Sequence, residues 1–114
     1  MAHIQLDYLK LMTEGDLELQ QTMLGMLLEE LPAAMDNIQA SFAEGNREEV
    51  QRVCHKLKAT LPFVGNTELE SINKMLEEVS KSGDSSGLAA PLVERLAALL
   101  PPVLQELREA MGDN

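Results

Sequence analysis

The sequence is poor in aromatic residues and has almost no cysteine. Phe, Trp and Tyr make up only 3% of its 114 residues, and Trp is absent. Leu, Met and Ala must therefore fill the interior, which favours helices over sheets. The single cysteine, Cys54, excludes a disulfide within the chain and fits a reducing compartment.

Long apolar runs and basic residues are also scarce. No run approaches the roughly 20 apolar residues that span a bilayer, and the first residues lack the basic and apolar regions of a signal peptide. The nine Lys and Arg residues face nineteen Asp and Glu residues, a formal net charge of −10 that disfavours nucleic acid and anionic membranes as partners. These features predict a soluble cytoplasmic domain, either free or excised from a larger protein. Its expected partner is a protein with a basic or apolar docking surface.

Apolar residues recur at helical spacing along nearly the whole chain, and no stretch alternates with period two. The predicted helices cover residues 4–12, 17–43, 47–63, 67–79 and 88–111. A loop rich in Ser, Gly and Asp is expected at residues 80–87. Asp16 is the expected N-cap of the second helix, and Thr67 with Glu70 forms a capping-box pattern at the fourth.

Four long amphipathic segments with short connections predict an all-α fold. The expected architecture is an antiparallel up-and-down four-helix bundle with a short N-terminal capping helix, forming a single domain over residues 1–114. Pro32 lies inside a predicted helix and should bend it or remove one backbone hydrogen bond, and the pair Pro101-Pro102 should break or kink the last helix. The buried stripe of the second helix is expected to consist of Leu17, Met23, Leu24, Leu27, Leu31, Met35, Ile38 and Phe42.

His55 lies on the solvent side of the third predicted helix. At ~100° per residue, the apolar residues form a stripe about 80° wide, and His55 lies roughly 155° from its centre. The stripe residues are Val50, Val53, Leu57, Leu61 and Val64. An exposed imidazole is commonplace, but Lys58 and Ala59 lie one turn further along the same side. Neutral imidazole is a good nucleophile near pH 7, and an ammonium group can stabilise phosphoryl oxygens. The group therefore describes an accessible nucleophilic nitrogen with a positive neighbour.

The segment from His55 to Gly65 resembles the signature of histidine-containing phosphotransfer (HPt) domains, His-x-Leu-Lys-Gly with a further Gly several residues on. Here it reads His55-Lys56-Leu57-Lys58-Ala59-Thr60-Leu61-Pro62-Phe63-Val64-Gly65. The resemblance extends over nearly the whole chain. Its other parts are Leu6-Asp7-Tyr8-Leu9 with Gly15-Asp16, then Gly45-Asn46, and Leu76-Glu77 followed by Ser82-Gly83-Asp84.

The resemblance implies a four-helix bundle in a multistep phosphorelay. His55 would accept a phosphoryl group from the aspartyl phosphate of a response-regulator receiver domain, pass it to another receiver, or both, and Lys58 would contact that group. The implied partners are receiver domains and a hybrid sensor histidine kinase, with Mg²⁺ on the receiver and no cofactor on this chain. We expect a monomer in the cytoplasm, or the cytoplasmic part of a membrane-anchored sensor kinase.

Two departures from the family pattern leave an alternative open. Ala59 stands where Gly is commonest, and Pro62 removes the backbone hydrogen bond to the Lys58 carbonyl, which should bend the helix and shift Lys58. The alternative is a non-catalytic helical adaptor, or a degenerate HPt domain that docks a receiver without transfer. The sequence has no Gly-x-x-x-x-Gly-Lys-Ser/Thr and no Gly-x-Gly-x-x-Gly pattern, so ATP binding and autokinase activity are not expected.

The remaining polar and aromatic candidates are weaker. Receiver docking is assigned to Gln51, Arg52, Ala59 and Phe63, against the alternative of an ordinary exposed face with Phe63 packed on a neighbouring helix. Glu77 and Asn73 lie on a flank of the fourth helix that could face His55, where a carboxylate could orient the imidazole, but a solvated Glu77 is favoured. Cys54 is expected to be a small buried hydrophobe and His3 a solvated residue, and they do not form a zinc site.

Overall fold

The structure is a computed structural model and describes residues 3–83 and 87–112. Its elements are α1 (Asp7–Met12), α2 (Leu17–Ala43), α3 (Arg47–Thr60), the 3₁₀ turn η1 (Leu61–Phe63), α4 (Thr67–Ser82) and α5 (Ala89–Ala110). Every regular element of the described residues is helical, which confirms the predicted all-α class.

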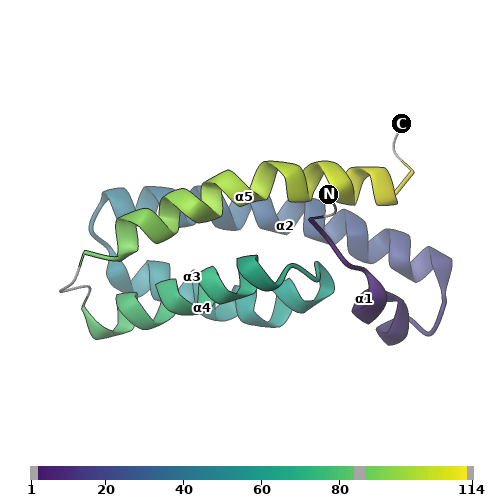
Figure 1. Cartoon of the computed structure of the whole chain (residues 1–114), viewed down its shortest axis with the longest axis horizontal. Helices are drawn as coiled ribbons and strands as arrows, with labels where there is room; N and C mark the ends of the chain where they lie inside the picture. The colour runs from purple at the N-terminus through teal and green to yellow at the C-terminus, as the bar shows by residue number, and fades with distance from the viewer. Residues whose placement is uncertain (1–2, 84–86, 113–114) are drawn as a thin grey trace.

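The four long helices pack around a common core. α3 packs against α2 and α4, α5 packs against the same two helices, and α1 lies against η1 (Figure 1). The N-terminal end of α2 extends past the ends of α3 and α4, and α1 lies beside it (Figure 1). The innermost side chains come from every helix and include Leu9, Ile38, Val50, Cys54, Leu76, Val103 and Leu107. The core therefore fixes α3 against α4, the pair that carries the candidate site.

Most helix boundaries agree with the predicted ones, with four corrections. α1 begins at Asp7 and not at the predicted residue 4, because residues 3–5 are bound to α5 and to the turn before α4 instead. Asp16 caps α2 as predicted, but the N-cap of α4 is Asn66, whose side chain accepts from the Leu69 backbone N–H at 2.9 Å, so the predicted capping box is wrong. α4 continues to Ser82, so its end lies beyond the predicted one, and residues 84–86 of the predicted loop lie outside the described residues. The α-helical part of the third segment ends at Thr60, where η1 takes over.

The prolines do not break their helices. α2 continues through Pro32, and α5 continues through Pro101 and Pro102, so the predicted break at 101–102 is wrong. Each proline removes one backbone hydrogen bond, but Pro101 is exposed, and water can satisfy a carbonyl freed on the solvent side. The buried side chains of Leu99, Leu100 and Val103 keep this stretch of α5 on the core.

Two residues near the N-terminal end of the fold lie differently from expectation. Leu17, predicted to be buried, is 74% exposed because it begins the part of α2 that extends past α3 and α4. His3, predicted to be solvated, is only half-exposed, and its backbone N–H donates to the Glu106 carboxylate at 2.7 and 2.8 Å.

Candidate functional site

The imidazole of His55 projects from the middle of α3. Its side chain is 69% exposed, in agreement with the helical-wheel prediction. Val50 and Val53, on the opposite side of the same helix, are buried in the core. The amphipathic pattern of α3 thus anchors one face and presents His55 on the other.

The buried Glu77 carboxylate on α4 contacts the inner ring nitrogen of His55, Nδ1. The Oε2 atom of Glu77 lies 2.8 Å from His55 Nδ1, and its Oε1 atom lies 3.3 Å from Lys58 Nζ. The Glu77 side chain is only 7% exposed, so the expectation of a solvated Glu77 is wrong. One carboxylate therefore joins His55 and Lys58, which are brought together through this third residue.

The charge state of Glu77 determines which ring nitrogen of His55 carries the proton and which one keeps a lone pair. Burial favours the neutral acid, but hydrogen bonds from His55 and Lys58 and their positive charges outweigh it, so the pKa of Glu77 is lowered. An ionised carboxylate only accepts hydrogen bonds, so Nδ1 must carry the proton in this contact. In the neutral ring Nε2 then keeps its lone pair. No residue that the structure describes forms a hydrogen bond with Nε2.

Asn73 fixes α4 against α3 one turn before Glu77. Its Nδ2 atom donates to the Cys54 carbonyl at 2.9 Å, and both residues are buried. Asn73 therefore reaches the backbone next to His55 rather than the imidazole itself. Burial, with a smaller effect of the Glu77 charge, raises the pKa of the Cys54 thiol to about 12, which keeps it protonated and unreactive, in line with its predicted packing role.

Lys58 keeps its place despite Pro62. The α-helix ends at Thr60, and Pro62 occupies the second position of η1, where a missing N–H is tolerated. The Lys58 side chain still reaches Glu77 from the last turn of α3. Although Pro62 was expected to shift Lys58, the Lys58 side chain contacts Glu77, the residue that also holds the His55 ring.

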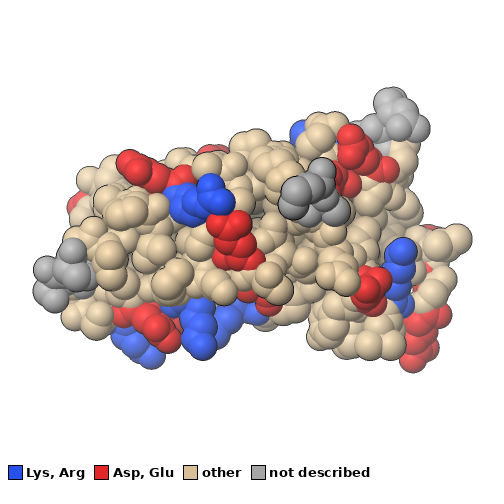
Figure 2. All heavy atoms as spheres, in the orientation of Figure 1, with Lys and Arg blue, Asp and Glu red and all other residues tan. Residues whose placement is uncertain are grey.

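The surface around His55 is much less acidic than the chain as a whole. Six of the nine Lys and Arg residues lie on α3 and α4, which also carry six acidic residues, whereas α2 has no basic residue. The six are Arg47, Arg52, Lys56, Lys58, Lys74 and Lys81. Figure 2 shows Lys and Arg side chains gathered along the edge formed by α3 and α4. Counting charges segment by segment would have revealed this asymmetry in the sequence.

Ala59 and Phe63 line a groove between α2 and the end of α3. The groove has a volume of about 260 Å³ and also contains Met23, Met26, Leu27, Glu30 and Thr60. Ala59 is exposed, and the Phe63 ring is half-buried, with its centroid 5.0 Å from that of Tyr8 on α1. Phe63 thus packs on a neighbouring helix and also lines an open surface, and its role in receiver docking stays a prediction. Tyr8 and Met26 are both partly exposed on this surface. The sequence did not suggest them as docking residues, because helical periodicity predicts burial or exposure and not function.

Arg52 is held against its own helix. Its Nε and Nη2 atoms donate to the two carboxylate oxygens of Glu49 at 2.7 and 2.6 Å, and Asn37 of α2 donates to the same carboxylate at 3.0 Å. Arg52 also lines a second groove, of about 380 Å³, which shares Glu30 and Thr60 with the first. Gln51 is half-buried on the preceding position. The four predicted docking residues therefore lie on α3 and η1, with Arg52 and Ala59 on adjoining grooves.

The Glu49 carboxyl is expected to stay ionised to about pH 2. Hydrogen bonds from Arg52 and Asn37 lower its pKa from 4.5 to about 2. We expect Arg52→Gln to return the pKa of Glu49 towards 4.5, because the first of these bonds then disappears. NMR titration of the Glu side-chain carboxyl carbons measures this, and an unchanged Glu49 titration in Arg52→Gln would contradict the contact.

A family model described as Hpt domain matches residues 22–112. This chain belongs to the Hpt domain family. Hpt domains carry out histidine phosphotransfer in phosphorelays and interact with receiver domains. No match was found among curated proteins or among solved structures.

In the described part of this Hpt domain, no helix is both long and apolar enough to cross a membrane. Within the same residues, no group of three or more His, Cys, Asp or Glu side chains is arranged to hold a metal ion.

Proposed function

We propose that this Hpt domain carries a phosphoryl group on Nε2 of His55, taken from the aspartyl phosphate of a response-regulator receiver, passed to another receiver, or both. The observation that supports this most strongly is the contact of Glu77 with Nδ1, at 2.8 Å. It assigns the proton to the inner nitrogen and leaves the outer one as an exposed nucleophile.

The transfer step follows from this arrangement. The lone pair of Nε2 forms the new N–P bond while the P–O bond of the acyl phosphate breaks, and the receiver aspartate leaves as a carboxylate. The ring becomes positively charged as it is phosphorylated, and the adjacent Glu77 carboxylate stabilises that charge. The onward transfer reverses these bond changes. Mg²⁺ and the carboxylates that hold it are expected on the receiver.

Lys58 is proposed to contact the phosphoryl group. It lies one turn from His55, and its ammonium already faces the same carboxylate, 3.3 Å from Glu77 Oε1. The side chain is half-exposed and long enough to move towards oxygens on Nε2. Neutralising those oxygens would favour both the acceptance and the retention of the phosphoryl group.

The receiver is proposed to dock across α3 and the groove beside it. This surface comprises Gln51, Arg52, Ala59 and Phe63, to which the structure adds Tyr8 and Met26. Ala59 lies one turn from His55, so a receiver seated on this docking surface brings its aspartate close to Nε2. Arg52 is paired with the ionised Glu49, so the two residues would offer a receiver a fixed polar contact with no net charge.

We further propose the helix topology, the oligomeric state and the location that the sequence predicted. The helices α2 to α5 form the antiparallel up-and-down bundle over a single domain. The domain acts as a monomer in the cytoplasm, free or within a larger hybrid sensor kinase.

The test is to incubate the Hpt domain with a receiver that carries radiolabelled phosphate and to measure the labelled phosphate that the domain acquires. We expect the chain to acquire phosphate that is labile in acid and stable in alkali, the behaviour of phosphohistidine. Incubation with ATP and Mg²⁺ alone should leave it unlabelled. A receiver that binds the chain but transfers no phosphate would favour the degenerate, docking-only alternative that Ala59 and Pro62 suggest.

A further inference from the structure

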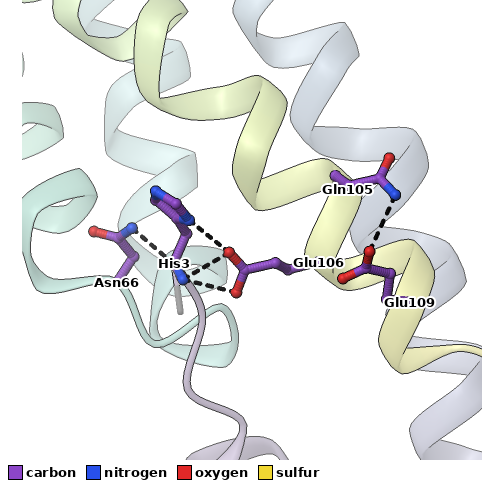
Figure 3. Close-up of polar contacts among 5 residues, drawn as sticks. All are labelled: His3, Asn66, Gln105, Glu106 and Glu109. Carbon is purple, nitrogen blue, oxygen red and sulfur yellow. Dashed lines mark hydrogen bonds and ion pairs between the residues drawn. The ribbon is translucent and has the colours of Figure 1, made fainter. Parts of the chain in front are cut away.

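The residues before α1 form a strap that joins three separate parts of the chain. The His3 backbone N–H and the His3 ring both contact the Glu106 carboxylate on α5 (Figure 3). The His3 carbonyl accepts a hydrogen bond from Asn66 Nδ2 at 2.8 Å, and the Gln5 N–H donates to the Val64 carbonyl at 3.0 Å. Residues 3–5, which we call the strap, are thus bound on both sides.

The turn at residues 64–66 is shaped to receive the strap. Gly65 has a φ of +72°, and a Cβ placed there would lie 1.9 Å from the Gln5 carbonyl oxygen. Only glycine permits that approach. Asn66 has two roles, because its Oδ1 atom caps α4 while its Nδ2 atom holds the strap.

The carboxylate that anchors the strap is ionised under ordinary conditions. Partial burial favours its neutral form, but the hydrogen bonds from the His3 backbone and ring outweigh burial, so the pKa of Glu106 is lowered. A charged acceptor makes the stronger kind of hydrogen bond with the His3 N–H.

The strap leads directly into α1 and fixes the start of this short helix. α1 has six residues and no side-chain N-cap hydrogen bond, and an isolated helix of this length is unstable in water. It is fixed by the burial of Leu9 and by packing on η1, where the Tyr8 and Phe63 rings meet. The position of Tyr8 therefore depends on where the strap ends.

We propose that Glu106 and Asn66 are positioning residues for phosphotransfer. By binding the strap, they hold α1, and with it Tyr8, in place beside the rest of the receiver-docking surface. Neither belongs to the group around His55, since Glu106 lies on α5 and Asn66 precedes α4. This inference rests on the proposed function.

The experiment compares Glu106→Gln with Glu109→Gln. The control makes the same charge change on the same helix, but Glu109 accepts a hydrogen bond from Gln105 and lies off the strap (Figure 3). Three quantities are measured: hydrogen exchange of the Gln5 amide, the KM and kcat of transfer from a phosphorylated receiver, and labelling by phosphoramidate. Phosphoramidate is a small donor that releases ammonia and needs no docking surface.

We expect Glu106→Gln to accelerate exchange of the Gln5 amide by roughly tenfold, because a charge-assisted anchor is lost. The KM for the receiver should rise by roughly fivefold while kcat and phosphoramidate labelling stay unchanged. Glu109→Gln should match the wild type in all three. Asn66→Asp, which keeps the capping oxygen but removes the donor to His3, should reproduce the effect of Glu106→Gln.

Two results would overturn the inference while leaving the proposed function intact. One is a wild-type KM in Glu106→Gln and Asn66→Asp despite faster exchange of the Gln5 amide. The other is unchanged exchange in both variants. Failure of the proposed function itself looks different, because the wild-type chain would then take no phosphate from any receiver.

Discussion

Replacing His55 by Gln is expected to abolish phosphoryl uptake from a phosphorylated receiver, with a fall in labelling of at least about 10³-fold. Gln has a similar reach and can still hydrogen-bond near Glu77, but it has no nucleophilic ring nitrogen. His55 is exposed and its replacement leaves no cavity, but Glu77 loses a charge-assisted hydrogen bond, so the free energy of unfolding should fall by about 1 kcal/mol.

The matched control is Lys56→Gln, the next residue along α3 and also exposed. It should keep most of the transfer activity. Circular dichroism melting of both variants checks that the fold is retained. Equal labelling of the wild type and His55→Gln would show that another residue takes the phosphate, and the assignment of His55 would be wrong.

Replacing Glu77 by Ala should lower the rate of transfer by roughly 10²-fold, the size of effect expected when a reacting group loses its positioning partner. His55 would then lose its fixed tautomer and orientation, and Lys58 would lose the acceptor that keeps it nearby. Single-turnover transfer from a phosphorylated receiver, measured by quenched flow, gives the rate.

The variant Glu77→Gln separates the two effects of Glu77, which are to orient the His55 ring and to stabilise its positive charge. Its side-chain carbonyl can still accept from Nδ1 but cannot stabilise the charged ring, so its transfer rate should lie between those of Glu77→Ala and the wild type. A rate in Glu77→Ala within twofold of the wild-type rate would contradict the positioning role.

The lowered pKa of Glu77 also sets the sign of a pH effect. A carboxyl whose pKa is lower in the folded state stabilises the fold above its ordinary value, 4.5, and loses that contribution as the pH falls through the folded value. Acid unfolding of the wild type should therefore show a contribution below pH 4.5 that Glu77→Gln lacks.

The helices and the exposure of His55 were predictable because both depend on local periodicity. The stripe from Val50 to Val64 fixes which side of α3 meets the core, and His55 follows from that at once. Leu17 shows the limit of the method: its spacing fits the stripe of α2, but it begins the helix beyond the ends of α3 and α4 and is 74% exposed.

The sequence offered Glu77 as a possible partner of His55 but favoured a solvated side chain, because the contact depends on how two helices align. Glu77 is 22 residues away, and its burial follows from the register of α4 on α3, which Asn73 helps to set. The periodicity of α4 places Glu77 on a flank that could face His55 and Glu78 on the exposed side, but it does not show that the Glu77 side chain is buried. The contact of His3 with Glu106, 103 residues apart, was hidden for the same reason.

The most direct measurement is ¹⁵N and ³¹P NMR of the chain after phosphorylation by its receiver. We predict a single N–P bond at Nε2 of His55, with the proton on Nδ1 facing Glu77. Phosphate on Nδ1, or an acyl phosphate on an Asp or Glu side chain, would contradict the proposed site.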